Sequence, residues 1–232
     1  MAGGLGLGLV LCACSEAELQ RGEAYVAPSA ALQERKTFGE TNPSELPANQ
    51  RAALVYAYAA TAIALYRAGE TDAAAVHAGK LDASANRGLM AGLDTMGFDP
   101  AVLTAVAASP EDETALAGAE AMLAALRPNA AGSIKETTRF LMRSLATEYE
   151  QGADAGTISD AEAYQTAYGC AVTARDIVAA QDDEAYGDLR LELELLVRMW
   201  PGRGPLATST PAPDSGMALA LSNVKLALAG LP

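Results

Sequence analysis

Hydrophobic residues recur at helical spacing along most of the chain. Across residues 50–68, large apolar and tyrosine side chains return every three or four positions, which predicts a helix packed against a core. Gly69 stands where that helix would end, and Thr71 or Asp72 can cap a second helix that continues toward Asn86. This part of the pattern therefore predicts a helix hairpin.

Capping signals predict four further helix starts. The pairs Asp99-Pro100 and Ser109-Pro110 combine a capping side chain with proline, whose missing N–H costs nothing at the first helical position. The second of these helices is expected to stop at Pro128. Two serine–glutamate capping boxes, Ser133 to Glu136 and Ser159 to Glu162, predict the other two starts. The helix after the first box has one apolar stripe, formed by Ile134, Leu141, Met142, Leu145 and Tyr149.

Residues 183–200 fit two patterns. Leucines alternate with charged residues at the period of a half-buried strand, at positions Leu189, Leu191, Leu193 and Leu195. A helix would instead place on one stripe Leu189, Leu193, Leu196 and Trp200. No partner strand is visible elsewhere, and a lone strand is unstable, so we predict a helix. A loop over residues 201–215 and a closing amphipathic helix over residues 217–228 complete the pattern.

Composition supports the helical interpretation. Half of the 232 residues are hydrophobic, only 5% are aromatic, and alanine, the strongest helix former, occurs in almost every segment. A chain of this length can bury a substantial core. We expect an all-α fold, an irregular bundle of about six to eight helices, with a helix-hairpin or solenoid-like arrangement as one form of it.

The charge balance bears on partners. The formal net charge is −13, from 29 acidic and 16 basic residues, and no basic stripe interrupts it. A phosphate backbone would be repelled, so nucleic-acid binding is not expected. Basic or cationic partners are favoured.

The N-terminus carries the most specific motif. Residues 5–13 form an uncharged apolar run of signal-peptide length, with Leu11 and Ala13 at its end and Cys14 directly after it. This box resembles that of bacterial lipoproteins, which implies removal of residues 1–13, lipidation of Cys14, and membrane attachment through the lipid. Cys12 fits less well, because Leu11 would precede it where a small residue is needed. The segment departs from the lipoprotein pattern in two ways: no Lys or Arg lies between Met1 and the apolar run, and a cysteine occupies the second position before Cys14.

The lipoprotein resemblance implies a location and a domain division. Ser15 follows Cys14 in place of the aspartate that marks inner-membrane retention, which favours the periplasmic face of the outer membrane. Residues 14–48, broken by proline and glycine, form a predicted tether, and residues 49–232 form the helical domain. The alternative is that the first residues are a glycine- and leucine-rich tail or a short buried helix.

Two internal segments resemble known motifs. A tetratricopeptide-type helix pair is suggested by Tyr58, Ala62, Leu65, Gly69, Ala74 and Ala78, in a single copy with no repeat following it. Residues 156–162 resemble the second half of a calcium-binding EF-hand loop. The first half lacks oxygen ligands, so a glycine-ended helix followed by a capping box explains the segment better.

No constellation for catalysis or metal binding is visible. His77 is the only histidine, and it lies in an alanine-rich helix, where a surface or interhelical position is expected. Cys170 would be the only cysteine after processing, and it reads as a small buried residue. The acidic runs at 111–113 and 182–184 sit at helix starts, where the helix dipole favours them. We therefore predict no catalytic, cofactor-binding or metal-binding residues.

These observations favour a non-catalytic envelope lipoprotein that binds a protein or serves as an accessory or scaffold module. An alternative is a periplasmic helical bundle that binds a small ligand in a pocket lined by Tyr56, Tyr58, Tyr66, Tyr164 and Tyr168. A hydrolase is a third possibility, which convergent carboxylates around His77 would support.

Overall fold

A computed structural model describes residues 45–82, 86–202 and 204–232. The predicted signal segment, Cys14 and almost all of the predicted tether lie outside the described residues. The described part consists of helices and one two-stranded hairpin, which confirms the all-α prediction. In chain order the elements are α2 (Ala48–Arg67), α3 (Thr71–Gly79), α4 (Arg87–Met90), η3 (Asp94–Met96), α5 (Pro100–Ala108), α6 (Glu113–Ala131), α7 (Ile134–Gly152), β1 (Ala153–Asp154), β2 (Thr157–Ile158), α8 (Ala161–Ala179), η4 (Glu184–Tyr186), α9 (Gly187–Val197) and α10 (Asp214–Gly230).

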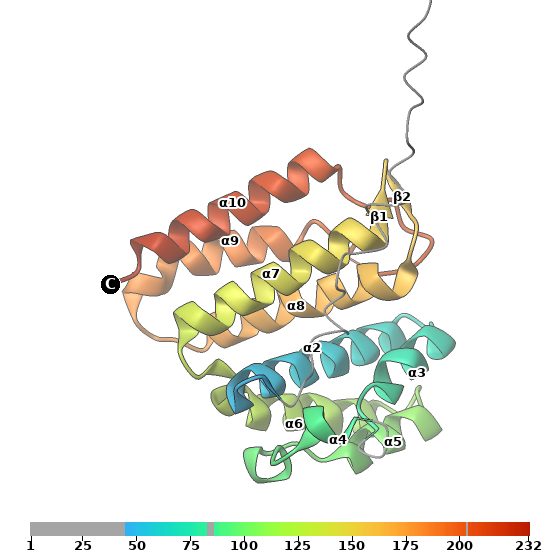
Figure 1. Cartoon of the computed structure of the whole chain (residues 1–232). Helices are drawn as coiled ribbons and strands as arrows, with labels where there is room; N and C mark the ends of the chain where they lie inside the picture. Colours follow the sequence, from blue (N-terminus) through green and yellow to red (C-terminus); the bar gives the residue numbers. More distant parts are fainter. Residues whose placement is uncertain (1–44, 83–85, 203) are drawn as a thin grey trace, which may run out of the picture. The chain divides into compact units, whose positions relative to one another are not determined.

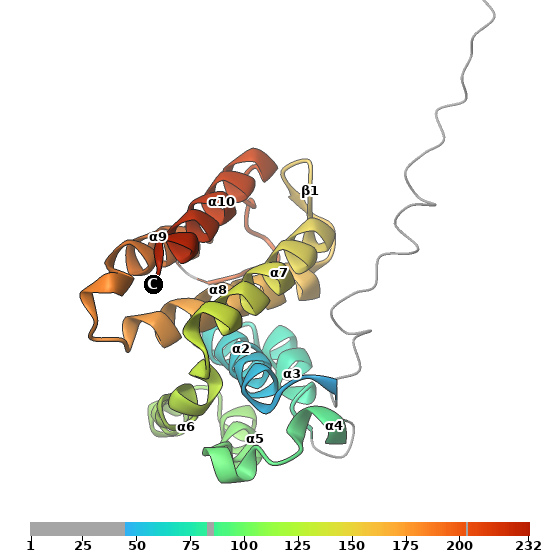
Figure 2. The ribbon, with the colours of Figure 1, turned by 60° about the vertical axis from the view of Figure 1, so that its left-hand side comes forward.

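The helices form hairpins whose order in space differs from their order in the chain. The α2–α3 pair packs between the α5–α6 pair and the α7–α8 pair, and the α9–α10 pair covers the far side of α7 and α8 (Figure 1). The same succession is visible after a turn of the view (Figure 2). Because the first pair is enclosed between later ones, the described domain is an irregular bundle of helix hairpins.

Helix α2 forms the centre of this bundle. Fourteen of its twenty residues are buried, and alanines are prominent among them. Small side chains on every face allow α3, α6, α7 and α8 to pack against the same helix. A helix that is apolar all round has to be buried, and α2 satisfies that requirement.

The contact between α2 and α8 is especially close at Gly169. A Cβ atom at this position would lie 2.3 Å from the Thr61 hydroxyl oxygen and 2.4 Å from the Ala57 carbonyl oxygen. The Thr61 hydroxyl donates to that same carbonyl at 2.8 Å. Glycine is therefore required at position 169 by the approach of a neighbouring helix.

A short β-hairpin joins α7 to α8. Its strands pair Ala153 with Ile158 and Asp154 with Thr157, and the two residues between them have positive φ, 48° at Ala155 and 81° at Gly156. Two positive φ values match the turn that suits the twist of a two-residue hairpin. The EF-hand-like segment is therefore largely the second strand and the start of α8, where we expected a glycine-ended helix and a capping box.

Several helix ends differ from the sequence prediction. At the predicted box from Ser159, the cap is Asp160, whose carboxylate accepts from the Ala163 N–H at 3.1 Å, while the Ser159 hydroxyl donates to the Gln151 carbonyl. Ser133 precedes α7 as predicted, but its side chain makes no capping hydrogen bond. Helix α8 is thus capped by the carboxylate of Asp160, which is a stronger hydrogen-bond acceptor than the hydroxyl of the neighbouring Ser159.

Two helix lengths also differ. Helix α3 ends at Gly79 because the chain turns there and buries Leu81, so the predicted continuation toward Asn86 is wrong. Helix α6 begins after Asp112, not at Ser109, and runs through Pro128 to Ala131. Packing of Leu126 and Ala130 in the core outweighs the one hydrogen bond that proline removes near the helix end.

Helix α9 resolves the ambiguous leucine pattern. Residues 187–197 are helical, and Leu189, Leu193, Leu196 and Trp200 are buried as the helical stripe predicts. Leu191 and Leu195 lie outside that stripe and are exposed. The strand-like alternation arises because this helix carries leucines on two faces.

Candidate functional site

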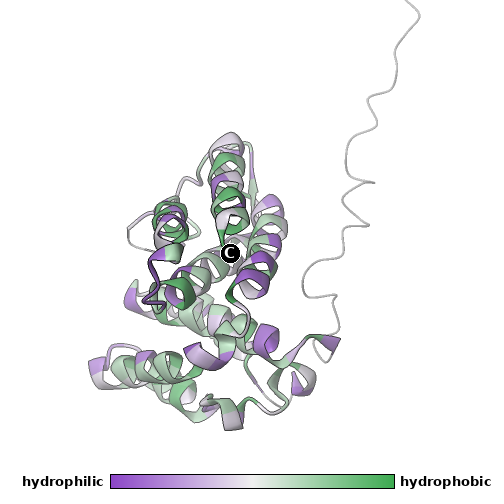
Figure 3. Ribbon diagram, turned by 90° about the vertical axis from the view of Figure 1, so that its left-hand side faces the viewer, coloured by the Kyte–Doolittle hydropathy of each residue, from purple (hydrophilic) through white to green (hydrophobic). Residues whose placement is uncertain are grey.

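The exposed apolar residues of the domain gather on α9 and α10. Five large hydrophobic side chains stand out as exposed in the described residues, and four of them belong to these two helices. We call these four the leucine face: Leu191 (58% exposed), Leu195 (44%), Leu219 (64%) and Leu226 (74%). The ribbon of α10, which ends at the point marked C in Figure 3, is coloured largely as hydrophobic.

Both helices have leucines on their outer face in addition to the hydrophobic residues that face the core. Helix α10 buries Met217, Leu221, Val224 and Leu228 at helical spacing. Leu219 and Leu226 fall seven residues apart on its outer side, and Leu191 and Leu195 fall four apart on α9, so each pair shares a face of its own helix. The core of the domain does not account for these four side chains.

A hollow of about 320 Å³ lies between the two helices at the leucine face. Its lining includes Asp188, Leu191, Glu192, Asn223, Leu226 and Ala227. Leucine and alanine supply apolar walls, and the two charged residues among its lining are both acidic. The hollow can hold an apolar side chain beside a positive charge.

The cations in and next to α9 and α10 do not line the hollow. Arg190 donates to the backbone carbonyls of Gln181 and Asp183, at 2.5 and 3.4 Å. Arg198 forms an ion pair with Glu194 at 3.4 Å. Lys225 is exposed on α10 and does not line the hollow. The charged side chains that line the hollow itself are therefore both acidic, while Arg190, Arg198 and Lys225 lie outside its lining.

A second feature is a polar cluster where α2, α3, α7 and α8 meet. His77 is fully buried, and its Nε2 lies 3.0 Å from the Gln165 amide oxygen. The histidine is thus interhelical, and the surface alternative is wrong. Burial lowers the pKa of His77 to about 4, with a further contribution from the positive charge of Lys80. The imidazole is neutral at pH 7, and because the Gln165 amide oxygen can only accept, Nε2 carries the proton and donates to it.

Lys80 forms the outer part of this cluster. Its Nζ pairs with a Glu162 carboxylate oxygen at 2.5 Å and lies 4.8 Å from the centre of the Tyr58 ring. Beneath it, Glu148 is only 8% exposed, and burial raises the pKa of Glu148 to about 7. Lys80 opposes that rise, while Asp160 and Glu162 add to it. The cluster therefore holds a carboxyl group that is half-protonated near neutral pH.

Sequence reasoning missed this cluster. Its members come from separate elements that are far apart in the chain, with His77 and Gln165 separated by 88 positions, and no local motif connects them. Cys170 is buried as predicted, and burial raises the pKa of its thiol far above the ordinary value, which keeps it protonated. Thiolate chemistry is disfavoured at such a site.

The five tyrosines of the predicted ligand pocket do not line one common cavity among those found. Tyr56 donates to an Asp176 carboxylate oxygen at 2.9 Å, and Tyr58 stacks under Lys80. Tyr164 and Tyr168 contact the Trp200 ring, each with ring centres 5.9 Å apart. Tyr66 lines a groove of about 430 Å³ between α3 and α5. Four of the five thus fill interhelical space, as tyrosines commonly do.

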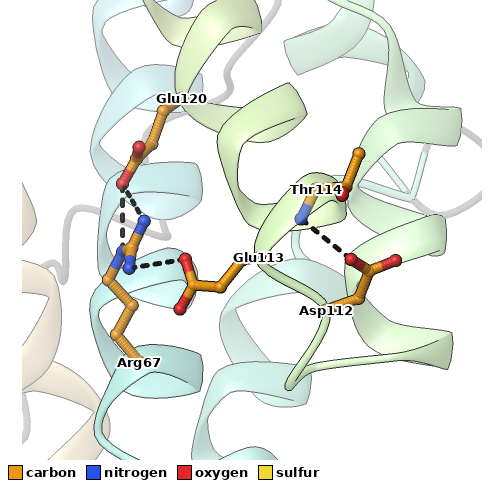
Figure 4. Close-up of polar contacts among 5 residues, drawn as sticks. All are labelled: Arg67, Asp112, Glu113, Thr114 and Glu120. Atoms are coloured by element: carbon orange, nitrogen blue, oxygen red, sulfur yellow. Dashed lines mark hydrogen bonds and ion pairs between the residues drawn. The ribbon is translucent and has the colours of Figure 1, made fainter.

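The acidic runs stabilise helix starts. Asp112 accepts from the Thr114 N–H at 2.8 Å, and Glu113 and Glu120 both bind the Arg67 guanidinium, which fastens the end of α2 to α6 (Figure 4). Asp183 likewise caps η4 by accepting from the Ala185 N–H. Across the described ranges, no group of three or more metal-ligating side chains is placed to hold an ion. No helix in the same ranges is long and apolar enough to cross a membrane.

Comparison with protein-family models, with curated proteins and with solved structures finds no match to this chain.

Proposed function

We propose that this chain is an envelope lipoprotein whose helical domain binds another protein through the leucine face. The proposal of protein binding is supported by the concentration of exposed leucines on α9 and α10. Exposed large hydrophobic side chains are costly in water, and where a folded domain gathers several of them on two neighbouring helices, the usual use is contact with a partner. The domain would act as an accessory or scaffold module.

The anchor part rests on the sequence. Leu11, Ala13 and Cys14 provide the lipoprotein-like box, and lipidation of Cys14 would hold the domain at the membrane. Confinement to a membrane surface raises the local concentration of a partner held on the same surface, so a modest interface suffices.

Metabolic labelling tests the anchor. We expect palmitate to be incorporated into the chain in its native host, and Cys14→Ala to abolish the label, because acylation requires the cysteine thiol. The same substitution at Cys12 serves as the control and should leave the label in place. Labelling that survives Cys14→Ala would remove the anchor from the proposal.

Photo-cross-linking tests the leucine face. A photoreactive residue at Leu226 should give a discrete protein adduct in the native host, because this side chain is the most exposed of the face. The matched position is Val76, which is 49% exposed on α3, away from the face, and should give no such adduct. The Leu226 adduct should weaken at least about fivefold with Leu191→Ser, since truncation of a central hot-spot residue costs more than about 1 kcal/mol. Equal adducts at both positions, or none at Leu226, would contradict binding through this surface.

A further inference from the structure

The leucine face also carries information about the chemistry of its partner. We infer that it accepts one amphipathic helix of a basic protein, with apolar anchors on the leucines and lysine or arginine beside the hollow. This inference rests on the proposed function and specifies the kind of partner. It follows from the spacing of the leucines, the hollow between them, and the charges that line it.

The spacing suits a helix. Helices α9 and α10 form an antiparallel hairpin, and Leu191 and Leu226 flank the hollow between them. Because the two helices run in opposite directions, Leu195 and Leu219 both lie toward the same end of the hairpin from that hollow. The resulting surface runs along two antiparallel helices and combines exposed leucines with one hollow of mixed apolar and acidic lining. A helix laid in a groove of this kind uses side chains at i, i+3 or i+4, and i+7 as anchors.

The lining charges select the sign of the partner. Asp188 and Glu192 line the hollow, while Arg190 of α9 donates to backbone carbonyls and Arg198, just after α9, pairs with Glu194. A partner that brings lysine or arginine to this edge gains an attraction without displacing an existing ion pair. The chain's net charge of −13 adds a long-range pull on a basic segment.

Two other occupants are disfavoured by the same charges. A second copy that met this face symmetrically would bring Asp188 and Glu192 of each molecule near each other. An anionic lipid surface would be repelled by the same carboxylates, and surface-seeking helices carry a basic polar face that α10, with Lys225 as its one basic residue, lacks.

Synthetic helices test the inference. Three peptides of about 18 residues with identical leucine spacing carry lysine, glutamine or glutamate at the polar positions. Their dissociation constants are measured by calorimetry against the full chain carrying Cys14→Ala, which removes the proposed lipid. We expect the lysine peptide to bind best, the glutamine peptide about tenfold more weakly, and the glutamate peptide not measurably, in line with rim charges and their salt dependence.

Paired variants locate the binding. Leu191→Ser with Leu226→Ser should weaken the lysine peptide at least about tenfold, whereas Val76→Ser should not. Asp188→Asn with Glu192→Gln should weaken it several-fold and flatten its salt dependence. Asp72→Asn with Glu111→Gln is the matched control, because it removes two charges elsewhere, including one in the first turn of α3.

The outcomes separate the partner's chemistry from the proposed function. Equal binding of the lysine and glutamine peptides, or equal losses in the control variants, overturns the inference of a basic partner. If no peptide binds while the Leu226 adduct forms, the partner is not an amphipathic basic helix and the proposed function stands. If both experiments fail, the leucine face is not a binding surface.

Discussion

At the scale of single residues, Glu148 and His77 are the least ordinary groups of the described domain. Both are buried in the polar cluster, and burial moves their pKa values in opposite directions, to about 7 for Glu148 and about 4 for His77. The folded state therefore prefers both groups neutral. Their effects on stability oppose each other over a defined pH window.

The signs follow from proton linkage. Ionisation of Glu148 costs folded-state stability as pH rises from about 4.5, its ordinary pKa, through about 7. Protonation of His77 costs stability as pH falls from about 6.5 through about 4. Between pH 4.5 and 6.5 the folded chain holds the Glu148 proton and the unfolded chain holds the His77 proton, so the two slopes cancel.

Glu148→Gln should remove one of these slopes. The amide keeps the shape of the carboxyl group without its charge, so we expect the variant to be more stable than the parent above pH 7, by up to about 3 kcal/mol. Near pH 4.5 the two should be equally stable. Urea unfolding at pH 4.5, 6 and 8 measures the difference. Glu111→Gln, at an exposed carboxylate, is the control and should change stability by no more than about 0.5 kcal/mol at each pH. A difference that does not grow with pH would contradict the burial of an ionisable Glu148.

At the scale of the elements, the distance between neighbouring helices decides which side chains each position can accommodate. Helix α2 contacts neighbours on every side, and at Gly169 helix α8 comes near enough to leave no room for a side chain. Gly187, at the start of α9, has no neighbouring atom within 4 Å of an added Cβ. The same substitution should therefore have opposite effects at the two positions.

Gly169→Ala should destabilise the domain by about 1–3 kcal/mol, the usual cost of overpacking, because the Ala57 backbone cannot move independently of α2. Gly187→Ala should be neutral or stabilise by up to about 1 kcal/mol, since alanine is the better helix former. Thermal unfolding of both variants makes the comparison. A stable Gly169→Ala protein would mean that α2 and α8 pack less closely than described.

At the scale of the whole molecule, the arrangement of hairpins leaves one surface chemically distinct. The α2–α3 pair is covered on both sides, whereas α9 and α10 cover α7 and α8 and turn a second set of leucines outward. The polar cluster lies where α2, α3, α7 and α8 meet, with Lys80 and Glu162 at its solvent side, and the leucine face lies at the edge of the bundle. The protein-binding proposal thus rests on the two helices that carry four of the five exposed large hydrophobic side chains in the described residues.

Much of the fold could be predicted from local signals. The alanine-rich composition, the apolar stripe of α7, the glycine turn at Gly69 and the capped start at Asp99 are each confirmed, because helix formation depends on neighbours three or four residues away. The strand-like alternation of leucines in α9 also pointed to the exposed face, because one helical stripe cannot contain both Leu189 and Leu193 and the exposed Leu191 and Leu195. The lipoprotein-like box of Leu11 to Cys14 also belongs to the sequence alone, and it stays a prediction.

Only the tertiary structure decided which residues meet. His77 and Gln165, Lys80 and Glu162, and Thr61 and Gly169 are joined by packing between helices far apart in the chain. Helical periodicity states that a face is apolar but not which helix covers it, because many pairings bury similar area. The enclosure of α2 and the exposure of Leu226 are both consequences of that choice of neighbours.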